Sequence, residues 1–293
     1  MFRSQNKDHV PGQFNGFAFW ALTTWLKQYV TLFFRPKVSG WGHLPEKGPY
    51  MLVSNHSAGI AVAEILSFAV LYTEQFKRNR PIAGFAHHMF YRLPGVHQFM
   101  RSVGAIPSTY QAAEEALNAG VPLLVFPGGD HESLRPIWKA NEVDFNNRKG
   151  FLKIARKAGI PIVPMGIRGS HYTSPILLRS SLLAWLLVIP RLAGLKRTGL
   201  SLGSFLGIAV IWTLPLHTGW LVALSWGWVL SLFQFFPIVP WTVSFKIGPP
   251  LSHDELFKNG TMQEAYDKVT QQVQELVLSP ARESSTSPQP AEE

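Results

Sequence analysis

Short apolar runs alternate with helix-like segments through the first half of the chain. The runs at 49–54 and 160–169 are almost continuously apolar, as strands buried on both faces are. Between such runs, segments such as 148–159 place apolar residues every three or four positions, which predicts helices that pack one face on a sheet. Two of these helices end at a glycine that leads directly into a strand, which indicates helical crossovers. We therefore predict an α/β fold with a mostly parallel sheet. The predicted strands are 49–54, 81–86, 104–107, 121–129, 160–169 and 242–248, and the predicted helices are 61–76, 110–120, 148–159 and 261–278.

A long stretch without charge interrupts this pattern. No charged side chain occurs in the 48 residues between Arg197 and Lys246, where two apolar runs are separated by a break at 215–219. A run of about 20 apolar residues can cross a bilayer, and the tryptophans here suit its interfaces. The strand at 242–248 should rejoin the sheet, so the chain must leave and return on the same side. We expect a membrane-embedded hairpin over 199–241; a pair of buried core helices is the alternative.

The N-terminal region carries another apolar stretch, residues 15–34. Trp20 and Trp25 within it suit the headgroup level of a membrane, so this stretch is either an interfacial helix or short anchor, or an ordinary packing helix. No small-residue cleavage site follows it, so we do not expect a removable signal peptide. The predicted parts are an N-terminal interfacial or short membrane helix (1–37), an α/β core (38–175), a hydrophobic membrane-associated insertion (176–241), the last strand and C-terminal helix of the core (242–278) and a disordered tail (279–293).

Composition mainly excludes classes of protein. The formal net charge is +9, yet charged residues make up only 15% of the chain and hydrophobic residues 46%. Disordered proteins are charge-rich, so that class is excluded, and a nucleic-acid partner is disfavoured. A basic, charge-poor chain with 10 Trp and 20 Phe is typical of a protein that contacts a membrane. The absence of cysteine excludes disulfides, Cys-ligated zinc and thiol nucleophiles.

The candidate chemistry lies at the ends of three predicted strands. His56 follows the strand at 49–54, and an acidic loop at 130–132 follows a glycine pair. The third strand ends in the glycine-containing segment 163–170. Catalytic groups collect at the carboxyl ends of strands in open α/β sheets, and a histidine there can act as a general base. A lone histidine is more often structural, but three such strand ends together favour a site.

These residues resemble the glycerolipid O-acyltransferase family, which includes the lysophospholipid acyltransferases. Four blocks follow the family's order between about Gly40 and Gly169: Asn55-His56, Gly104 to Pro107, Phe126 to Gly129 and Ile160 to Pro164. The resemblance implies a membrane-associated enzyme that moves a fatty acyl group from a thioester donor, acyl-CoA or acyl carrier protein, to a lipid hydroxyl. It also implies that His56 is the general base, that no further cofactor is needed, and that membrane lipids are the partners.

The resemblance further implies a set of substrate-binding residues around His56. The backbone N–H groups of Gly128 and Gly129 are expected to hold the developing oxyanion. The other residues expected at the substrate site are Asn55, Ser57, Phe126, Pro127, Asp130, Glu132, Arg148 and Lys149. The alternative for Arg148 and Lys149 is that they lie in an ordinary solvated turn of a helix.

The chain departs from the family pattern after His56. The position of the motif's Asp is Ala61, and the next carboxylate is Glu64. On one continuous helix His56 and Glu64 would lie about 12 Å apart, so Glu64 reaches only if residues 57–59 form a loop. The NHS-G and FPGG sequences resemble the branch of diacylglycerol and phytol-ester acyltransferases, in which the acidic residue comes later. We expect Glu64 to be the catalytic partner of His56. The alternatives are that Glu64 is only a helix-surface carboxylate, or that Asp130 or Glu132 orients His56 instead.

The third block also lacks the Glu and Arg of the phosphate-acceptor members, since Gly128 and His131 stand there. A lysophosphatidate acceptor is thus less favoured than a neutral or lyso-lipid hydroxyl. A catalytically inactive lipid-binding or transfer protein on the same scaffold is the main alternative function, and an integral membrane protein with a merely structural α/β part is a weaker one. Histidine spacing predicts no metal site. The expected location is a membrane, at the cytoplasmic face of the inner or endoplasmic membrane.

Overall fold

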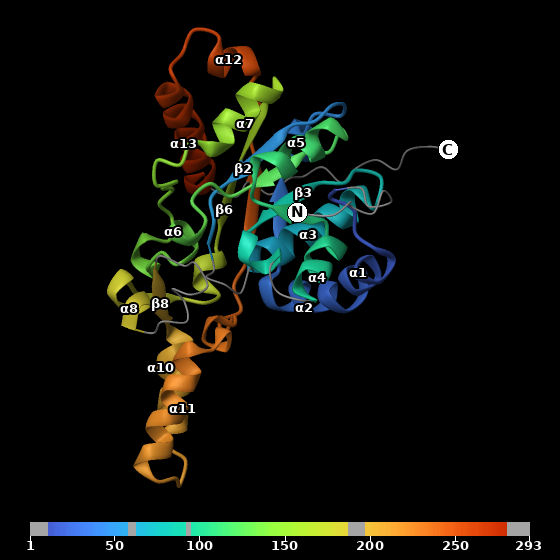
Figure 1. The fold of residues 1–293 in the computed structure, drawn as a ribbon. Coiled ribbons are helices and arrows are strands. Elements are labelled where there is room, and N and C mark those ends of the chain that lie inside the picture. Colours follow the sequence, from blue (N-terminus) through green and yellow to red (C-terminus); the bar gives the residue numbers. More distant parts are fainter. Residues whose placement is uncertain (1–10, 58–62, 92–94, 187–196, 280–293) are drawn as a thin grey trace, which may run out of the picture.

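The computed structural model describes residues 11–57, 63–91, 95–186 and 197–279, and a seven-stranded sheet forms its centre (Figure 1). The strand order is β1-β9-β6-β2-β5-β3-β4, and all neighbours are parallel except β6 and β9. The predicted α/β fold with a mostly parallel sheet is confirmed, and the strand predicted at 242–248 does rejoin it. The strands are β1 (Lys37–Ser39), β2 (Met51–Ser54), β3 (Ala83–Ala86), β4 (Ala105–Pro107), β5 (Leu123–Val125), β6 (Ile162–Arg168) and β9 (Ser244–Ile247), with β7 (Ile176–Ser180) and β8 (Thr198–Ser201) in a separate antiparallel pair.

Helices surround the sheet and also form an extension below it in Figure 1. The helices predicted at 110–120, 148–159 and 261–278 are present, as is the described part of the helix predicted at 61–76. The last of them opens with the capping box of Thr261 and Glu264. The longer helices are α1 (Gly16–Ala21), a π-helical turn (Leu22–Leu26), α2 (Lys27–Phe34), α3 (Ala63–Phe76), α4 (Val96–Ser102), α5 (Tyr110–Asn118), α6 (Asp130–Ser133), α7 (Gly150–Ala158), α8 (Ser181–Leu186), α10 (Leu202–Ile211), α11 (Thr218–Leu230), α12 (His253–Phe257) and α13 (Met262–Leu278). Short 3₁₀ turns lie at Trp41–His43, His88–Tyr91, Ile137–Lys139, Ser170–Tyr172 and Leu232–Phe235.

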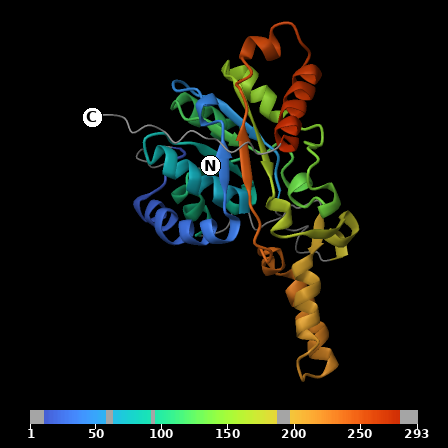
Figure 2. The ribbon, with the colours of Figure 1, turned by 180° about the vertical axis from the view of Figure 1, so that it is seen from behind.

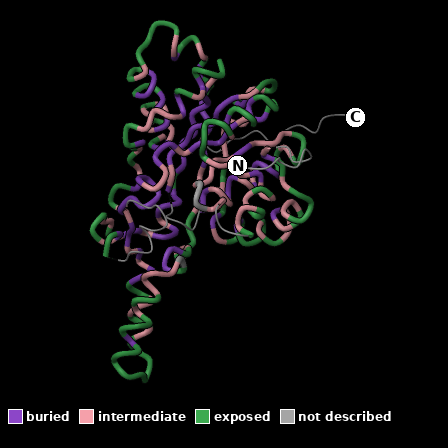
Figure 3. The backbone as a smooth tube through the Cα atoms, viewed as in Figure 1, coloured by how far each residue is buried: buried purple, intermediate pink, exposed green. Residues whose placement is uncertain are grey.

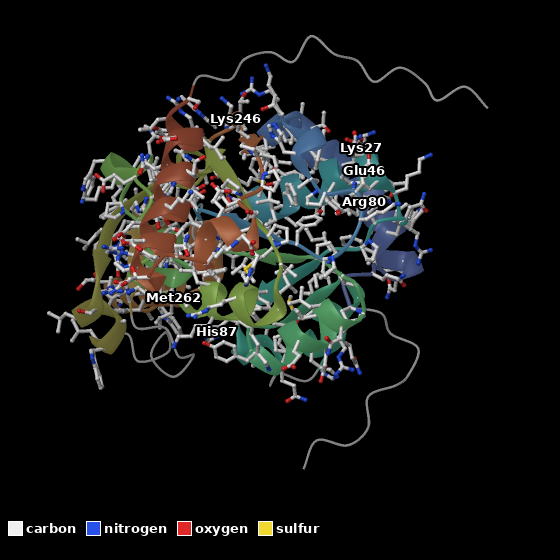
Figure 4. The ribbon with its side chains drawn as sticks, turned by 90° about the horizontal axis from the view of Figure 1, so that it is seen from above. Lys27, Glu46, Arg80, His87, Lys246 and Met262 are labelled. Atoms are coloured by element: carbon white, nitrogen blue, oxygen red, sulfur yellow. The ribbon has the colours of Figure 1, made fainter. Side chains whose placement is uncertain are left out.

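The sheet is buried on both faces because alternate residues of its strands enter different hydrophobic clusters. In β2, Met51 and Val53 join the cluster formed with α5, α7 and α13, whereas Leu52 joins the cluster formed with α2 and α3. Seen from above, Met262 at the start of α13 and Lys27 on α2 lie on opposite sides of the sheet (Figure 4). The residues of the central strands are accordingly buried, and those of the outer helices are more exposed (Figure 3). The strand that leads to the candidate site therefore has a rigid support on each side.

The N-terminal apolar stretch is helical and packs one face against α3. Leu22, Val30 and Phe34 are buried in that contact. Trp20 and Trp25 remain outside, with 50% and 73% of their surface exposed. The stretch thus packs as an ordinary helix would and keeps an outer apolar face, whose contact with a membrane stays a prediction.

The charge-free stretch forms a helical hairpin of α10 and α11 that projects from the rest of the protein (Figures 1 and 2). The Trp212 indole N–H donates to the Ser225 hydroxyl across the hairpin, at 3.2 Å. At 1.5 Å per residue, α10 is about 15 Å long and α11 about 20 Å. Within the described ranges, no helix combines the length and the apolar character that a membrane crossing requires. The chain leaves and returns at the same end, and the embedding of the hairpin in a membrane stays a prediction.

The small sheet of β7 and β8 joins this hairpin to the large sheet. Ile176 of β7 packs with Leu134, which follows α6, and with Phe235, which follows α11. The apolar composition of 176–241 predicted only a hydrophobic insertion and no strands, so this sheet is an addition to the expected organisation. The cluster fixes the base of the hairpin beside α6. The disordered tail predicted at 279–293 lies almost wholly outside the described residues.

Gly166 of β6 marks a place where the sheet and α13 are too close for a side chain. A Cβ there would lie 2.6 Å from the backbone nitrogen of Val277 and 2.7 Å from the Cβ of Leu276. We expect Gly166→Ala to lower the free energy of unfolding by about 1–3 kcal/mol, because overpacking must displace the helix. The measurement is urea unfolding followed by tryptophan fluorescence.

Gly84→Ala is the matched control, since Gly84 also lies in a strand and a Cβ there meets nothing within 4 Å. Equal unfolding free energies for the two variants would contradict this packing.

Candidate active site

The carboxyl ends of β2, β5 and β6 meet at one edge of the sheet, because these three strands are parallel neighbours. This edge faces the end of the molecule from which α10 and α11 project (Figure 1). The residues after β2 include His56, those after β5 form the FPGG loop (Phe126–Gly129), and those after β6 include Ser170. The three strand ends singled out by the sequence thus come together.

Asn55 ties the end of β2 to β6. Its side-chain amide donates to the carbonyl of Ile167, and its side-chain oxygen accepts from the Ile167 N–H, both at 2.8 Å. The side chain is buried. Asn55 therefore continues the strand pairing by one residue and determines where His56 emerges, while its contact with a substrate stays a prediction.

His56 contacts the carboxylate of Glu64. Its Nδ1 lies 2.6 Å from Glu64 Oε1, and the same oxygen accepts from the Ser57 backbone N–H at 3.0 Å. Glu64 is completely buried in the first turn of α3, while the His56 side chain is 14% exposed. An ionised carboxylate only accepts hydrogen bonds, so the proton of neutral His56 lies on Nδ1 and Nε2 is left for a substrate. The structure describes α3 from Ala63, and the preceding residues 58–62 lie outside the described ranges.

Glu132 holds the same loop from the other side. Its Oε2 accepts from the His56 backbone N–H at 3.0 Å, and its Oε1 accepts from Arg135 at 2.9 Å and from the Asp144 N–H at 3.0 Å. Glu132 is completely buried. This burial raises the pKa of Glu132 to about 7, although Arg135 and the two N–H groups favour the charged form.

Gly128 leaves the space that the Glu132 carboxylate occupies. A Cβ at position 128 would lie 2.2 Å from Glu132 Oε2. The phosphate-acceptor acyltransferases that the sequence resembles have Glu at this position. In this chain the carboxylate comes instead from a residue four positions later.

The FPGG loop lies against the His56 ring. The ring of Phe126 packs on it with centroids 4.9 Å apart and an interplanar angle of 30°. Pro127 is buried and has no N–H to donate. The Gly129 N–H donates to the Phe126 carbonyl at 3.1 Å, and its role in binding an oxyanion stays a prediction. Within the described residues the Gly128 N–H makes no hydrogen bond, and it remains available for that role.

The two basic residues predicted at the substrate site, Arg148 and Lys149, point in different directions. Arg148 donates to the Gly128 carbonyl at 2.9 Å and pairs with Asp130 Oδ1 at 2.6 Å, so this pair supports the FPGG loop. Lys149 points away, with its Nζ 6.0 Å from the centre of the Tyr266 ring on α13. The structure brings Arg148 and Asp130 to the loop and leaves Lys149 outside it.

Two buried residues after β6 were missed as members of the site. The Ser170 hydroxyl pairs with that of Ser57. Burial and the positive charge of Arg135 lower the pKa of His171 to about 3, so His171 stays neutral beside the site. Their position directly after a strand end was the available signal. In the part of the chain that the structure describes, no three acidic or histidine side chains come together as metal ligands would.

The acyltransferase family model matches residues 35–168. The bovine protein called "DGAT1/2-independent enzyme synthesizing storage lipids" is 30% identical over 129 residues, which are 44% of this chain and 37% of its own. Chloroplastic phytyl ester synthase 2 of Arabidopsis thaliana is 28% identical over 146 residues, which are 47% of this chain and 20% of its own. The chain thus spans less than half the length of these curated relatives.

The crystal structure of the 1-acyl-sn-glycerophosphate acyltransferase PlsC from Thermotoga maritima aligns with 89% of this chain and 80% of its own, at 18% identity and a TM-score of 0.49. The segment matched by the family model contains β1 to β6, His56, Glu64 and the FPGG loop. Residues 35–168 of this chain are therefore similar to the acyltransferase family.

Proposed function

We propose that the chain is a membrane-bound O-acyltransferase that moves a fatty acyl group from acyl-CoA or acyl carrier protein to a hydroxyl of a glycerolipid, lysophospholipid or neutral lipid. The observation that carries this proposal is the buried Glu64 carboxylate on Nδ1 of His56, within the family segment. Among the acceptors we favour a neutral lipid. The Arg of the phosphate-acceptor block is absent, and the two curated relatives are named for storage lipids and phytyl esters.

The proposed reaction is a direct transfer without an acyl-enzyme or a further cofactor. Nε2 of His56 takes the proton of the acceptor hydroxyl while its oxygen attacks the thioester carbonyl carbon. The Gly128 N–H donates to the resulting oxyanion. The carbon–sulfur bond then breaks, and the leaving thiolate takes this proton from the His56 imidazolium.

The two carboxylates have separate roles in this mechanism. Glu64 binds Nδ1, so it keeps the ring in one tautomer and stabilises the imidazolium as it forms. Glu132 binds only the backbone N–H of His56, so it positions the loop without touching the ring. Of the alternatives considered from the sequence, this geometry favours Glu64 as the catalytic partner.

The apolar hairpin supports a membrane location. Two helices of about 15 Å and 20 Å reach into a hydrocarbon core of about 30 Å without crossing it. The packing of Leu134, Ile176 and Phe235 places the base of the hairpin beside α6, which gives a lipid acceptor a short path from the bilayer to the site. The net charge of +9 suits the anionic cytoplasmic face of the inner or endoplasmic membrane. The exposed apolar side chains of the hairpin include Phe205, Leu206, Val210, Trp212, Leu214, Leu216, Trp220, Val222, Leu224 and Trp226.

His56→Ala should lower the rate of acyl transfer by about 10²–10⁴-fold without lowering the melting temperature, because it removes the general base. The assay incubates purified protein in detergent with labelled acyl-CoA or acyl carrier protein and a panel of lipid hydroxyls. Glu64→Gln should also slow transfer, and the double variant should be no slower than His56→Ala, since Glu64 acts through His56.

His97→Ala on α4 is the matched control and should keep the wild-type rate. A wild-type rate in His56→Ala would contradict the mechanism. Absence of transfer by the wild type from either donor to every acceptor would instead favour a lipid-binding protein.

The raised pKa of Glu132 predicts that the free energy of unfolding depends on pH. Its pKa is 4.5 in its ordinary state and about 7 in the folded protein, so the folded state binds this proton more tightly. Its stabilising contribution is therefore complete below about pH 4.5 and is lost as the pH rises to about 7. The difference in unfolding free energy between the wild type and Glu132→Gln should fall over this range and then level off, as measured by urea unfolding. A difference that rises with pH would contradict the raised pKa.

Trp220→Ser combined with Trp226→Ser should weaken binding to phospholipid vesicles by about tenfold or more, because each indole loses apolar burial. The assay is vesicle flotation, and 1 M salt should not release the wild type if apolar contact dominates. Trp138→Ser is the control, since Trp138 is 67% exposed against 66% for Trp220 but lies on a 3₁₀ turn outside the hairpin segment. The embedded hairpin would be contradicted if salt released the wild type and the double variant bound vesicles as well as the Trp138→Ser control.

A further inference from the structure

Two arginines, one in the small sheet and one directly before it, converge on His131 of α6. Arg179 of β7 donates to the His131 carbonyl at 2.7 Å, and Arg197, directly before β8, lies 3.3 Å from His131 Nδ1. Arginine only donates, so Nδ1 accepts and the proton of His131 lies on Nε2, which donates to Asp144 at 2.7 Å. His131 is the residue before Glu132, so this contact lies one residue from the group that holds the His56 loop.

The carboxylates around these arginines already have other partners. Asp130 pairs with Arg148, Asp144 with His131, and Glu132 with Arg135. Within the described ranges, neither Arg179 nor Arg197 has an ion pair of 4 Å or less. Both guanidinium groups therefore keep positive charge that no carboxylate neutralises directly.

Arg197 also disfavours the charged form of Arg179. Burial and the positive charges of Arg197 and Arg135 lower the pKa of Arg179, and the attraction of Asp144 and Asp130 only opposes this. Both side chains are half-buried, so a ligand can still reach them. A bound anion would relieve this repulsion and use donors that the protein leaves open.

We propose that Arg179 and Arg197 bind a phosphate group of a substrate beside the His56 loop. Guanidinium groups bind phosphate through paired hydrogen bonds, which gives them an advantage over lysine at such a site. The inference rests on the proposed function, because both thioester donors carry phosphate on their pantetheine arm. A lysophospholipid acceptor carries phosphate as well, whereas a neutral lipid acceptor has none. Both arginines lie outside the segment that the family model matches, so the small sheet adds this site to the acyltransferase core.

The test measures binding without turnover, by titration calorimetry on the detergent-solubilised full chain. The donor probes are CoA and pantetheine, and the acceptor probes are lysophosphatidate and monoacylglycerol; pantetheine and monoacylglycerol lack the phosphate. Arg179→Gln and Arg197→Gln should weaken the phosphate-bearing probe by about ten- to a hundredfold and leave its phosphate-free counterpart unchanged. Arg156→Gln, an equal loss of charge on the exposed surface of α7, should change neither.

The pair of probes that responds identifies the source of the phosphate. Loss of CoA affinity assigns the site to the donor, and loss of lysophosphatidate affinity assigns it to the acceptor; either supports the proposal. If the Gln variants lower the melting temperature, Arg179→Lys and Arg197→Lys keep the charge without the fork and should bind severalfold more weakly than the wild type. Unchanged affinity for both phosphate-bearing probes in folded variants overturns the site. Phosphate binding by a chain without transferase activity would leave the site standing and contradict the proposed function.

Discussion

Two completely buried carboxylates, Glu64 and Glu132, hold the loop that carries His56. Burying an ionised carboxylate costs several kcal/mol unless hydrogen bonds and opposite charges offset the lost hydration. For Glu64 this cost is offset by His56 Nδ1 and the Ser57 N–H. For Glu132 it is offset only in part by Arg135 and two backbone N–H groups, so its pKa is raised. These partners come from the end of β2, from the α6 loop and from the segment before α7. The loop can therefore take this conformation only when all of these elements are in place.

The architecture of the sheet could be predicted because its signals are local. Continuous apolar runs such as β2 and β6 are buried on both faces, and glycines after α5 and α7 end the helices that connect them. β1 was missed because none of its three residues is buried, so it lacks the continuous apolar run of the central strands. The short β7 and β8 were missed because their apolar residues could not be separated by composition from those of the hairpin that follows.

The site could be predicted as a region and in part as contacts. Strand ends and motif order brought His56 and the FPGG loop together, and Glu64 followed from the absence of an acid at Ala61. The sequence could not show that the Glu132 carboxylate fills the space left by Gly128, because this depends on a close approach within an irregular loop. The direction of Lys149 toward α13, and the approach of Arg179 and Arg197 to His131, are likewise tertiary contacts without a sequence period.

The central claim is that Glu64 keeps the proton of neutral His56 on Nδ1 and leaves Nε2 free to accept the proton of a lipid hydroxyl. Nitrogen-15 NMR of histidine-labelled protein, at a pH where His56 is neutral and with His56→Ala to assign its signals, measures this directly. We expect a protonated Nδ1 and an unprotonated Nε2. A proton on Nε2 would contradict it, because that nitrogen could not then act as the base.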